Sequence, residues 1–361
     1  MLTPEGCKQR RTRLLQQLQM SGPLLLGDPL NLRYFANCYL DPFSIGADFG
    51  GLLLVQPDGH ATLYHDHRAP KSVELAWVDE LIPVKWYDGK SPGQGPRRLI
   101  LRDVVDHAGT NGLIHDQIND PTAPDLWRIV TGMRRSKDPD EVALLKACMR
   151  VAEAGHAWAR ANVQPGMTEL NVYNGILQAC SEAAGHPVIL YGDFTVSSGA
   201  STRGGPPTQH TLQVGEMLIL DFSVIIQGYR SDFTNTLVIG GRPIEEQNRL
   251  LQLCAQAMKA GEQQLRAGTT CQTVYDSVRD VFAVAGVATA FPHHAGHGLG
   301  ISHPEPPFFV EYSTETLIEG DVVTLEPGLY IDGIGGLRIE HNYLITASGF
   351  EQLSNHTISL T

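Results

Sequence analysis

Two stretches of the chain combine strongly apolar strand patterns with isolated carboxylates. The first, from Met217 to Val238, opens with four consecutive apolar residues that are followed by Asp221. Such an apolar run is typical of a buried strand, where an aspartate is costly unless its charge is compensated. Gly228 can turn the chain back, and antiparallel pairing would then bring Asp232 opposite Asp221 on the same face of the sheet. We therefore expect a hairpin that bears two carboxylates.

A second hairpin is predicted from Val322 to Thr346. Glu326 and Glu340 lie at equal distances from Gly333, in its turn at residues 332–333. Because side chains alternate between the faces of a strand, this symmetry places both glutamates on one face. His297 lies between the two hairpins in the sequence, within Gly-His-Gly. Four carboxylates and one imidazole are thus expected to converge.

The helical patterns that precede the two hairpins repeat. Two helices are predicted ahead of each hairpin, at residues 139–160 and 168–184 and at residues 243–267 and 270–285. A glycine follows each of these helices, at positions 166, 185, 268 and 286. Two equivalent halves that face each other would bring the four carboxylates into one cleft. The sequence therefore predicts an α+β domain with an internal pseudo-two-fold repeat, from residue 134 to residue 361.

Residues 1–133 are expected to form a separate α/β domain. A helix is predicted at 11–20 and strands at 23–26, 51–55 and 61–64, with a turn at residues 58–59 between the last two. The domain boundary falls near residue 134, just before a strong helix start. Asp138 is the expected N-cap, Pro139 the first helical residue and Glu141 the third.

Composition narrows the classes of function. The chain has 361 residues, a formal net charge of −12 and no long basic run, which argues against nucleic acid as a partner. Its apolar stretches fall short of the ~18 residues that a membrane helix needs, and the N-terminus lacks a signal-peptide core. Neither a membrane partner nor export is therefore expected. Six scattered cysteines without CxxC spacing are interpreted as reduced, which favours the cytoplasm.

The crowding of carboxylates indicates bound metal. Four ionised carboxylates in a cleft of low dielectric repel one another, and some would take up protons unless about four positive charges neutralised them. Two divalent cations supply that charge. A ligand set made mainly of oxygens, with one imidazole from His297, is typical of sites for Mn, Fe, Co or Zn. A structural zinc site would instead use mainly Cys and His. The alternative, that each acid forms an ordinary salt bridge or turn, is disfavoured by the joint arrangement.

Five motifs resemble the signature of the M24 metallopeptidases, a family whose fold is called pita-bread. In chain order they are Gly215–Asp221, Gly228–Thr234, His293–Gly300, Glu326–Gly328 and Arg338–Glu340. The similarity covers the chain from about residue 134 to the end. The surroundings of Arg33 resemble the creatinase/prolidase-type N-terminal domain, which favours the prolidase and aminopeptidase P branch of the family.

The resemblance implies roles for individual residues. Asp232 and Glu340 would bridge two metal ions, Asp221 would complete one ion, and His297 with Glu326 the other. The ions would share a hydroxide that attacks the scissile amide, since bound metal lowers the pKa of water. Manganese is the expected metal, with Co, Zn or Fe as alternatives. A homodimer is also implied.

Three further residues are expected to be catalytic: His293, His303 and Glu305. His293 matches a position that lies beside the substrate in prolidase-like members, although a structural histidine is the alternative. Family members usually carry a second histidine seven residues after the metal histidine, where this chain has Pro304. His303 comes one position early, which in an extended strand turns its imidazole to the other face unless a bulge presents it to the cleft.

A further family histidine, about seventeen residues before the first metal aspartate, is also missing. The segment from Arg203 to His210 contains glycines and prolines there, and His210 is its only imidazole. We interpret His210 either as a solvated loop residue or as a replacement. Loss of one general acid or base typically lowers the rate 10²- to 10⁴-fold. An altered substrate or a slow enzyme would both be compatible with these changes.

The sequence favours a metallopeptidase that hydrolyses a short, proline-containing peptide at an Xaa-Pro bond, as a dipeptidase or as an aminopeptidase. Two alternatives remain open. A creatinase-like enzyme would open a C–N bond without metal, and the five intact ligands argue against it. A non-catalytic protein-binding module on the same scaffold would typically have lost those ligands.

Overall fold

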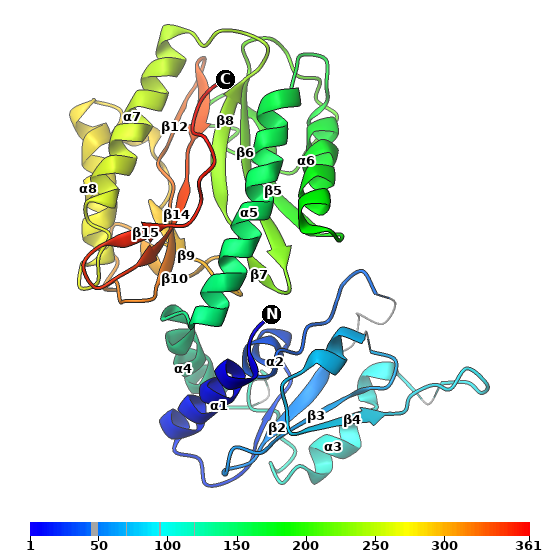
Figure 1. The fold of residues 1–361 in the computed structure, drawn as a ribbon. Coiled ribbons are helices and arrows are strands. Elements are labelled where there is room, and N and C mark those ends of the chain that lie inside the picture. The colour runs from blue at the N-terminus through cyan, green and yellow to red at the C-terminus, as the bar shows by residue number, and fades with distance from the viewer. Residues whose placement is uncertain (45–49, 70, 94, 119) are drawn as a thin grey trace. The chain divides into compact units, whose positions relative to one another are not determined.

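The computed structural model describes residues 1–44, 50–69, 71–93, 95–118 and 120–361. The chain divides into two compact units, Met1–Arg134 and Arg135–Thr361 (Figure 1). None of the helices in the described part of the chain is long and apolar enough to cross a membrane.

The first unit is built on a four-stranded sheet. Its strands are β1 (Leu24–Leu26), β2 (Gly51–Val55), β3 (Ala61–Asp66) and β4 (Glu80–Val84), which lie in this order in space. Antiparallel pairing joins β1 to β2 and β2 to β3, whereas β4 runs parallel to β3. The helices are α1 (Pro4–Leu18), α2 (Pro29–Ala36), α3 (Arg102–His107) and α4 (Ala123–Arg135), with short 3-10 turns at Lys71–Leu75 and Arg97–Leu99. The predicted α/β character of this part of the chain is confirmed.

Four long helices flank the strands of the second unit. They are α5 (Pro139–Asn162), α6 (Glu169–Ala184), α7 (Glu245–Glu262) and α8 (Cys271–Val284), and a 3-10 turn follows at Ala288–Ala290. Figure 1 shows α5 and α6 on one flank of the strands and α7 and α8 on the other. Helix α5 begins as its sequence predicts, with Pro139 first and the Glu141 carboxylate accepting a hydrogen bond from the Asp138 N–H at 2.9 Å. Two helices precede each carboxylate-bearing segment, as the repeat predicts.

The first carboxylate segment forms an antiparallel sheet around β6. Strand β6 (Met217–Ile226) pairs with β5 (Ile189–Ser197), β7 (Tyr229–Arg230) and β8 (Phe233–Val238). The predicted register is wrong in one respect, because Asp221 pairs with Thr234 and not with Asp232. The Ser231 hydroxyl accepts from the Val224 N–H at 3.0 Å, and the Ser231 N–H donates to the Val224 carbonyl at 3.1 Å. Asp232 consequently lies in a break between β7 and β8.

The second carboxylate segment spans a five-stranded sheet and a separate hairpin. The sheet has the order β10-β9-β11-β14-β15, with β9 (Gly296–Gly298), β10 (Glu305–Phe309), β11 (Val322–Leu325), β14 (His341–Ile345) and β15 (Phe350–Gln352). The hairpin pairs β12 (Gly328–Ile331) with β13 (Gly335–Arg338). Because Gly328 faces Arg338 in this register, Glu326 and Glu340 lie just beyond the open end of the hairpin.

An apolar core holds the ends of β11 and β13 in place. Val278 of α8 and Leu325 of β11 are fully buried in it, together with Leu337 of β13. Gly261 of α7 brings the helix against the sheet, since a Cβ at this position would lie 2.9 Å from a methyl carbon of Leu325. Close packing of this kind fixes the ends of the two strands, after which Glu326 follows directly and Glu340 follows Ile339.

Candidate metal centre

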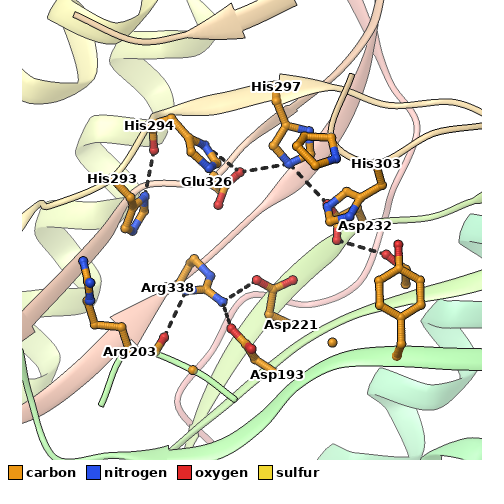
Figure 2. A pocket seen from close by; sticks show the side chains of 15 residues that line it. Asp193, Arg203, Asp221, Asp232, His293, His294, His297, His303, Glu326 and Arg338 are labelled. Atoms are coloured by element: carbon orange, nitrogen blue, oxygen red, sulfur yellow. Dashed lines mark hydrogen bonds and ion pairs between the residues drawn. The ribbon is translucent and has the colours of Figure 1, made fainter. Parts of the chain in front are cut away.

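The five predicted metal ligands meet in the second unit although they come from distant parts of the chain. Asp221 belongs to β6, Asp232 follows β7, His297 belongs to β9, Glu326 follows β11, and Glu340 follows β13. All of them except Glu340 line one pocket of about 440 Å³ (Figure 2). Glu340 is only 1% exposed and lies next to the other carboxylates.

Asp232 stands at the middle of this group. Oxygens of Asp221, Asp232 and Glu340 all lie within 4.8 Å of one another. On its other side, Asp232 Oδ2 lies 3.5 Å from His297 Nε2, which in turn lies 3.5 Å from Glu326 Oε1. One carboxylate therefore contacts both halves of the ligand set.

Glu340 has one oxygen that the protein supports and one that it does not. Thr234 Oγ1 donates to Glu340 Oε2 at 2.7 Å, and the Glu340 N–H donates to the Thr234 carbonyl at 3.1 Å. Oε1 is buried and has no hydrogen-bond partner within the described residues. A buried carboxylate oxygen without a partner is costly. It is the oxygen that a metal ion would ligate.

The electrostatics of the cluster also call for added positive charge. Burial, reinforced by the charges of Asp232 and Asp221, raises the pKa of Glu340 well above its ordinary value. Burial likewise raises the pKa of Asp221 to about 7, against the opposing effect of Arg338. Within the described residues, Arg338 offsets these acidic charges only in part. A donor set of carboxylates with one imidazole fits divalent ions of the Mn, Fe, Co and Zn class.

Arg338 also lines the pocket and holds Asp221 in place. Its Nη2 donates to Asp193 Oδ2 at 2.5 Å and also to Asp221 Oδ2, and its Nη1 donates to the Tyr330 hydroxyl at 2.7 Å. Figure 2 shows one end of the guanidinium directed at both aspartates. The sequence places Arg338 in one of the family motifs but indicates no role for it. It gives no indication that Asp193 or Tyr330 belongs to the site.

His293 lies in the pocket, as expected. Its Nδ1 donates to the His294 carbonyl at 2.7 Å, and its Nε2 lies 3.2 Å from the Tyr330 hydroxyl. Burial lowers the pKa of His293 to about 4, so its imidazole is neutral near pH 7. The neighbouring His294 also lines the pocket, with Nδ1 3.3 Å from Glu326 Oε1. Sequence reasoning missed His294, for which the doubled histidine was the only available signal.

His303 also reaches the pocket despite its early position in the sequence. Its Nε2 lies 2.7 Å from Asp232 Oδ2, and its ring lies 4.9 Å from that of His297. The register between β9 and β10 shifts between Glu305 and Phe308, so an irregularity accompanies the one-residue displacement. The hydrogen bond and charge of Asp232 outweigh the effect of burial and raise the pKa of His303. Its catalytic role remains a prediction.

Glu305, by contrast, is not among the described residues that line the pocket. Its Oε1 accepts a hydrogen bond from Lys137 Nζ at 2.7 Å, and the two side chains are 4% and 1% exposed. The geometry thus gives Glu305 a buried ion pair. Its expected catalytic role stays a prediction.

The missing family histidine is replaced by a different arrangement. His210 is 41% exposed and lies 2.9 Å from Glu216, away from the pocket lining. The position seventeen residues before Asp221 is Gly204, where a Cβ would lie only 1.9 Å from Asp193 Oδ2. The carboxylate of Asp193, which pairs with Asp221 across β5 and β6, therefore occupies the space next to this glycine.

Comparison with known proteins agrees with this geometry. The model of metallopeptidase family M24 matches residues 143–347. An uncharacterized peptidase of Staphylococcus aureus (strain USA300) is 26% identical over 341 residues, which cover 91% of this chain and 93% of that protein.

Solved structures share the fold over nearly the whole chain. The Xaa-Pro dipeptidase from Bacillus anthracis superposes with a TM-score of 0.79 at 24% identity and covers 98% of this chain and 99% of that one. The X-Pro aminopeptidase from Thermotoga maritima gives a TM-score of 0.77 at 20% identity, with coverage of 97% and 98%. The predicted pita-bread architecture is confirmed. The family match spans more than half of the chain, which therefore belongs to metallopeptidase family M24 and is a peptidase.

Proposed function

We propose that this protein hydrolyses short peptides at an Xaa-Pro bond with the help of two divalent metal ions. The observation that carries the proposal is the complete ligand set around one pocket, which includes a buried Glu340 oxygen without a protein partner. The names of the Bacillus dipeptidase and the Thermotoga aminopeptidase support the choice of an Xaa-Pro bond. A protein-binding module would not need this set.

The family resemblance supplies the assignment of the ligands. Asp232 and Glu340 would bridge the two ions, Asp221 would complete one of them, and His297 with Glu326 the other. The central place of Asp232, whose oxygens approach both the Asp221–Glu340 side and His297, supports its bridging role. When bound, the two ions would supply an activated water near neutral pH and polarise the scissile carbonyl.

The other pocket residues would orient the substrate and move protons. His293 is neutral near pH 7 and donates through Nδ1, so its Nε2 is the acceptor for a hydroxyl or a substrate N–H. His303, which faces Asp232, would exchange a proton with the substrate during bond cleavage. Arg338 would keep Asp221 oriented toward the ions.

Further details of the proposal come from the family resemblance and from composition. Manganese is the proposed native metal, because the ligands are mainly oxygens. A homodimer and a cytoplasmic location complete it, and the absence of CxxC spacing among the cysteines supports the latter.

Turnover of defined peptides tests the function. Protein loaded with Mn, Co or Zn should hydrolyse Xaa-Pro dipeptides or Xaa-Pro-Yaa tripeptides, and the matched Xaa-Ala peptides much more slowly. Chelation of the metal or the Asp232→Asn substitution should abolish the activity. Absence of turnover on both peptide types with all three metals would overturn the proposal.

A further inference from the structure

Arg203 is a cation that lines the metal-centre pocket, and no group in the described residues pairs with it. It belongs to the loop between β5 and β6, and it lines the same pocket as Asp221 and His293. Figure 2 shows its side chain extending on the side of the pocket where His293 lies. Within the described part of the chain, the Arg203 guanidinium forms no hydrogen bond or ion pair, whereas Arg338 binds both Asp193 and Asp221.

The backbone that carries Arg203 is nevertheless fixed. Arg338 Nη1 donates to the Arg203 carbonyl at 3.2 Å, so the loop is tied to the buried guanidinium behind the pocket. Two residues further, the Gly205 carbonyl accepts from the Phe194 N–H at 2.9 Å, which joins the loop to β5. A long cationic side chain therefore projects from a fixed point beside the site of bond cleavage.

A guanidinium in this setting suits a carboxylate of the substrate. Arginine presents two parallel N–H donors that match the two oxygens of a carboxylate, which makes such pairs short and strong. Two substrate groups could supply the anion: the free α-carboxylate of a dipeptide or an acidic side chain. The pocket of about 440 Å³ is in the range of sites for small ligands.

The size of the pocket favours the α-carboxylate. A residue spans at most about 3.6 Å of extended chain, so the terminal carboxylate of a dipeptide lies only one residue beyond the scissile bond. It would remain inside a pocket of this size. In a longer peptide the same position is a neutral amide, which leaves the guanidinium without a counter-charge and so selects against longer chains.

We propose that Arg203 binds the free α-carboxylate of the residue that follows the scissile bond, so that the enzyme is a dipeptidase rather than an aminopeptidase of longer peptides. This inference rests on the proposed Xaa-Pro hydrolysis. Arg203 is then a specificity-determining residue, and its loss should alter the choice of substrate while the metal ligands remain intact.

The test compares a dipeptide with its terminal amide. We measure kcat/KM of the Mn-loaded protein for Ala-Pro and for Ala-Pro amide in the wild type, in Arg203→Gln and in Arg203→Lys. The exposed Arg128, which is not among the residues that line the pocket, provides the control Arg128→Gln. The wild type should prefer the free acid by about 10- to 100-fold, the range expected for one charge-assisted interaction. This preference should fall to near unity in Arg203→Gln through KM, persist in part in Arg203→Lys, and stay unchanged in Arg128→Gln.

Binding of the product provides a readout independent of turnover. Calorimetry should show that Arg203→Gln binds proline more weakly than the wild type does. The two proteins should bind prolinamide with the same affinity. Thermal unfolding of each variant confirms that it is folded, as expected for an exposed side chain.

Several outcomes would overturn the proposal for Arg203. Equal kcat/KM for acid and amide in the wild type would do so, as would a preference that survives Arg203→Gln or an equal loss on both peptides. An Arg203-dependent preference for longer peptides with Asp or Glu after the scissile bond would assign the guanidinium to an acidic side chain instead. If the wild type cleaves neither peptide, the proposed function itself fails, and the proposal for Arg203 falls with it.

Discussion

Loss of one partner of the buried ion pair between Lys137 and Glu305 should destabilise the fold without abolishing catalysis. Glu305 occupies a position that the family resemblance marks as functional, yet its carboxylate faces Lys137 Nζ at 2.7 Å. Both side chains are almost fully enclosed. A Cβ at Gly300 would lie 2.4 Å from Glu305 Oε1, so the surroundings are tightly packed. The substitution Glu305→Leu would leave the ammonium of Lys137 buried without its carboxylate.

The expected cost follows from this burial. Breaking a buried pair by removing one partner typically destabilises a protein by about 3–5 kcal/mol, whereas replacing both partners with apolar groups is often neutral. Glu305→Leu should therefore lower the free energy of unfolding by roughly 3–5 kcal/mol. The double variant Lys137→Met/Glu305→Leu should regain most of the loss. A loss of this size is a large part of the ~5–15 kcal/mol that stabilises a typical domain.

Urea unfolding followed by circular dichroism measures these differences, and the two single variants and the double variant form a cycle. The milder Glu305→Gln variant, assayed while folded, should keep kcat within about tenfold of the wild type, a far smaller loss than removal of a general acid or base causes. Two results would refute the reasoning. One is a double variant that loses the sum of the single effects. The other is a folded Glu305→Gln variant whose kcat falls by about 10²-fold or more.

Three other predictions address the pocket and the core behind it. His303→Gln should lower kcat by about 10²- to 10⁴-fold with KM little changed, as steady-state kinetics would show, and an unchanged kcat would exclude proton transfer by His303. Gly204→Ala should displace the Asp193 carboxylate, because the added Cβ would lie 1.9 Å from its present position. A competitive titration should then show metal binding weakened by about 10- to 100-fold. Unchanged metal affinity would show that Asp193 does not support the ligands. Burial lowers the pKa of His156 from 6.5 to about 3, so the unfolded chain binds the extra proton first and stability is lost as pH falls below about 6.5. As the pH falls from about 7 to about 5, protonation of His156 in the unfolded chain should lower the free energy of unfolding by ~2 kcal/mol. The His156→Gln variant should not show this loss. A variant whose stability depends on pH as the wild type's does would contradict the prediction.

Sequence reasoning succeeded where a local pattern determines the structure. The helix that starts at Pro139 follows from its cap, and the strand of Asp221 follows from its apolar run. The five candidate ligands could be named because their motifs have fixed spacing; the structure brings these residues together, and their ligand roles stay predictions.

The errors and omissions arise from contacts that no local pattern encodes. Asp232 does not face Asp221 in the sheet because Ser231 forms two hydrogen bonds with Val224 that break the strand. His303 reaches the pocket from the segment just before β10, a placement that the sequence could only offer as an alternative. Asp193 is a residue of β5 outside every recognised motif, and its contacts with Arg338 and Gly204 in the folded chain reveal it.

The number of bound metal ions tests the central claim most directly. Metal-free protein titrated with Mn²⁺ by calorimetry, and then dialysed and analysed by mass spectrometry for bound metal, should retain two ions per chain. The Asp232→Asn variant should retain fewer, because Asp232 is the proposed bridge between them. Retention of two ions by the wild type would support the dinuclear centre. A wild-type protein that binds no divalent metal, or binds two ions equally well without the Asp232 carboxylate, would contradict it.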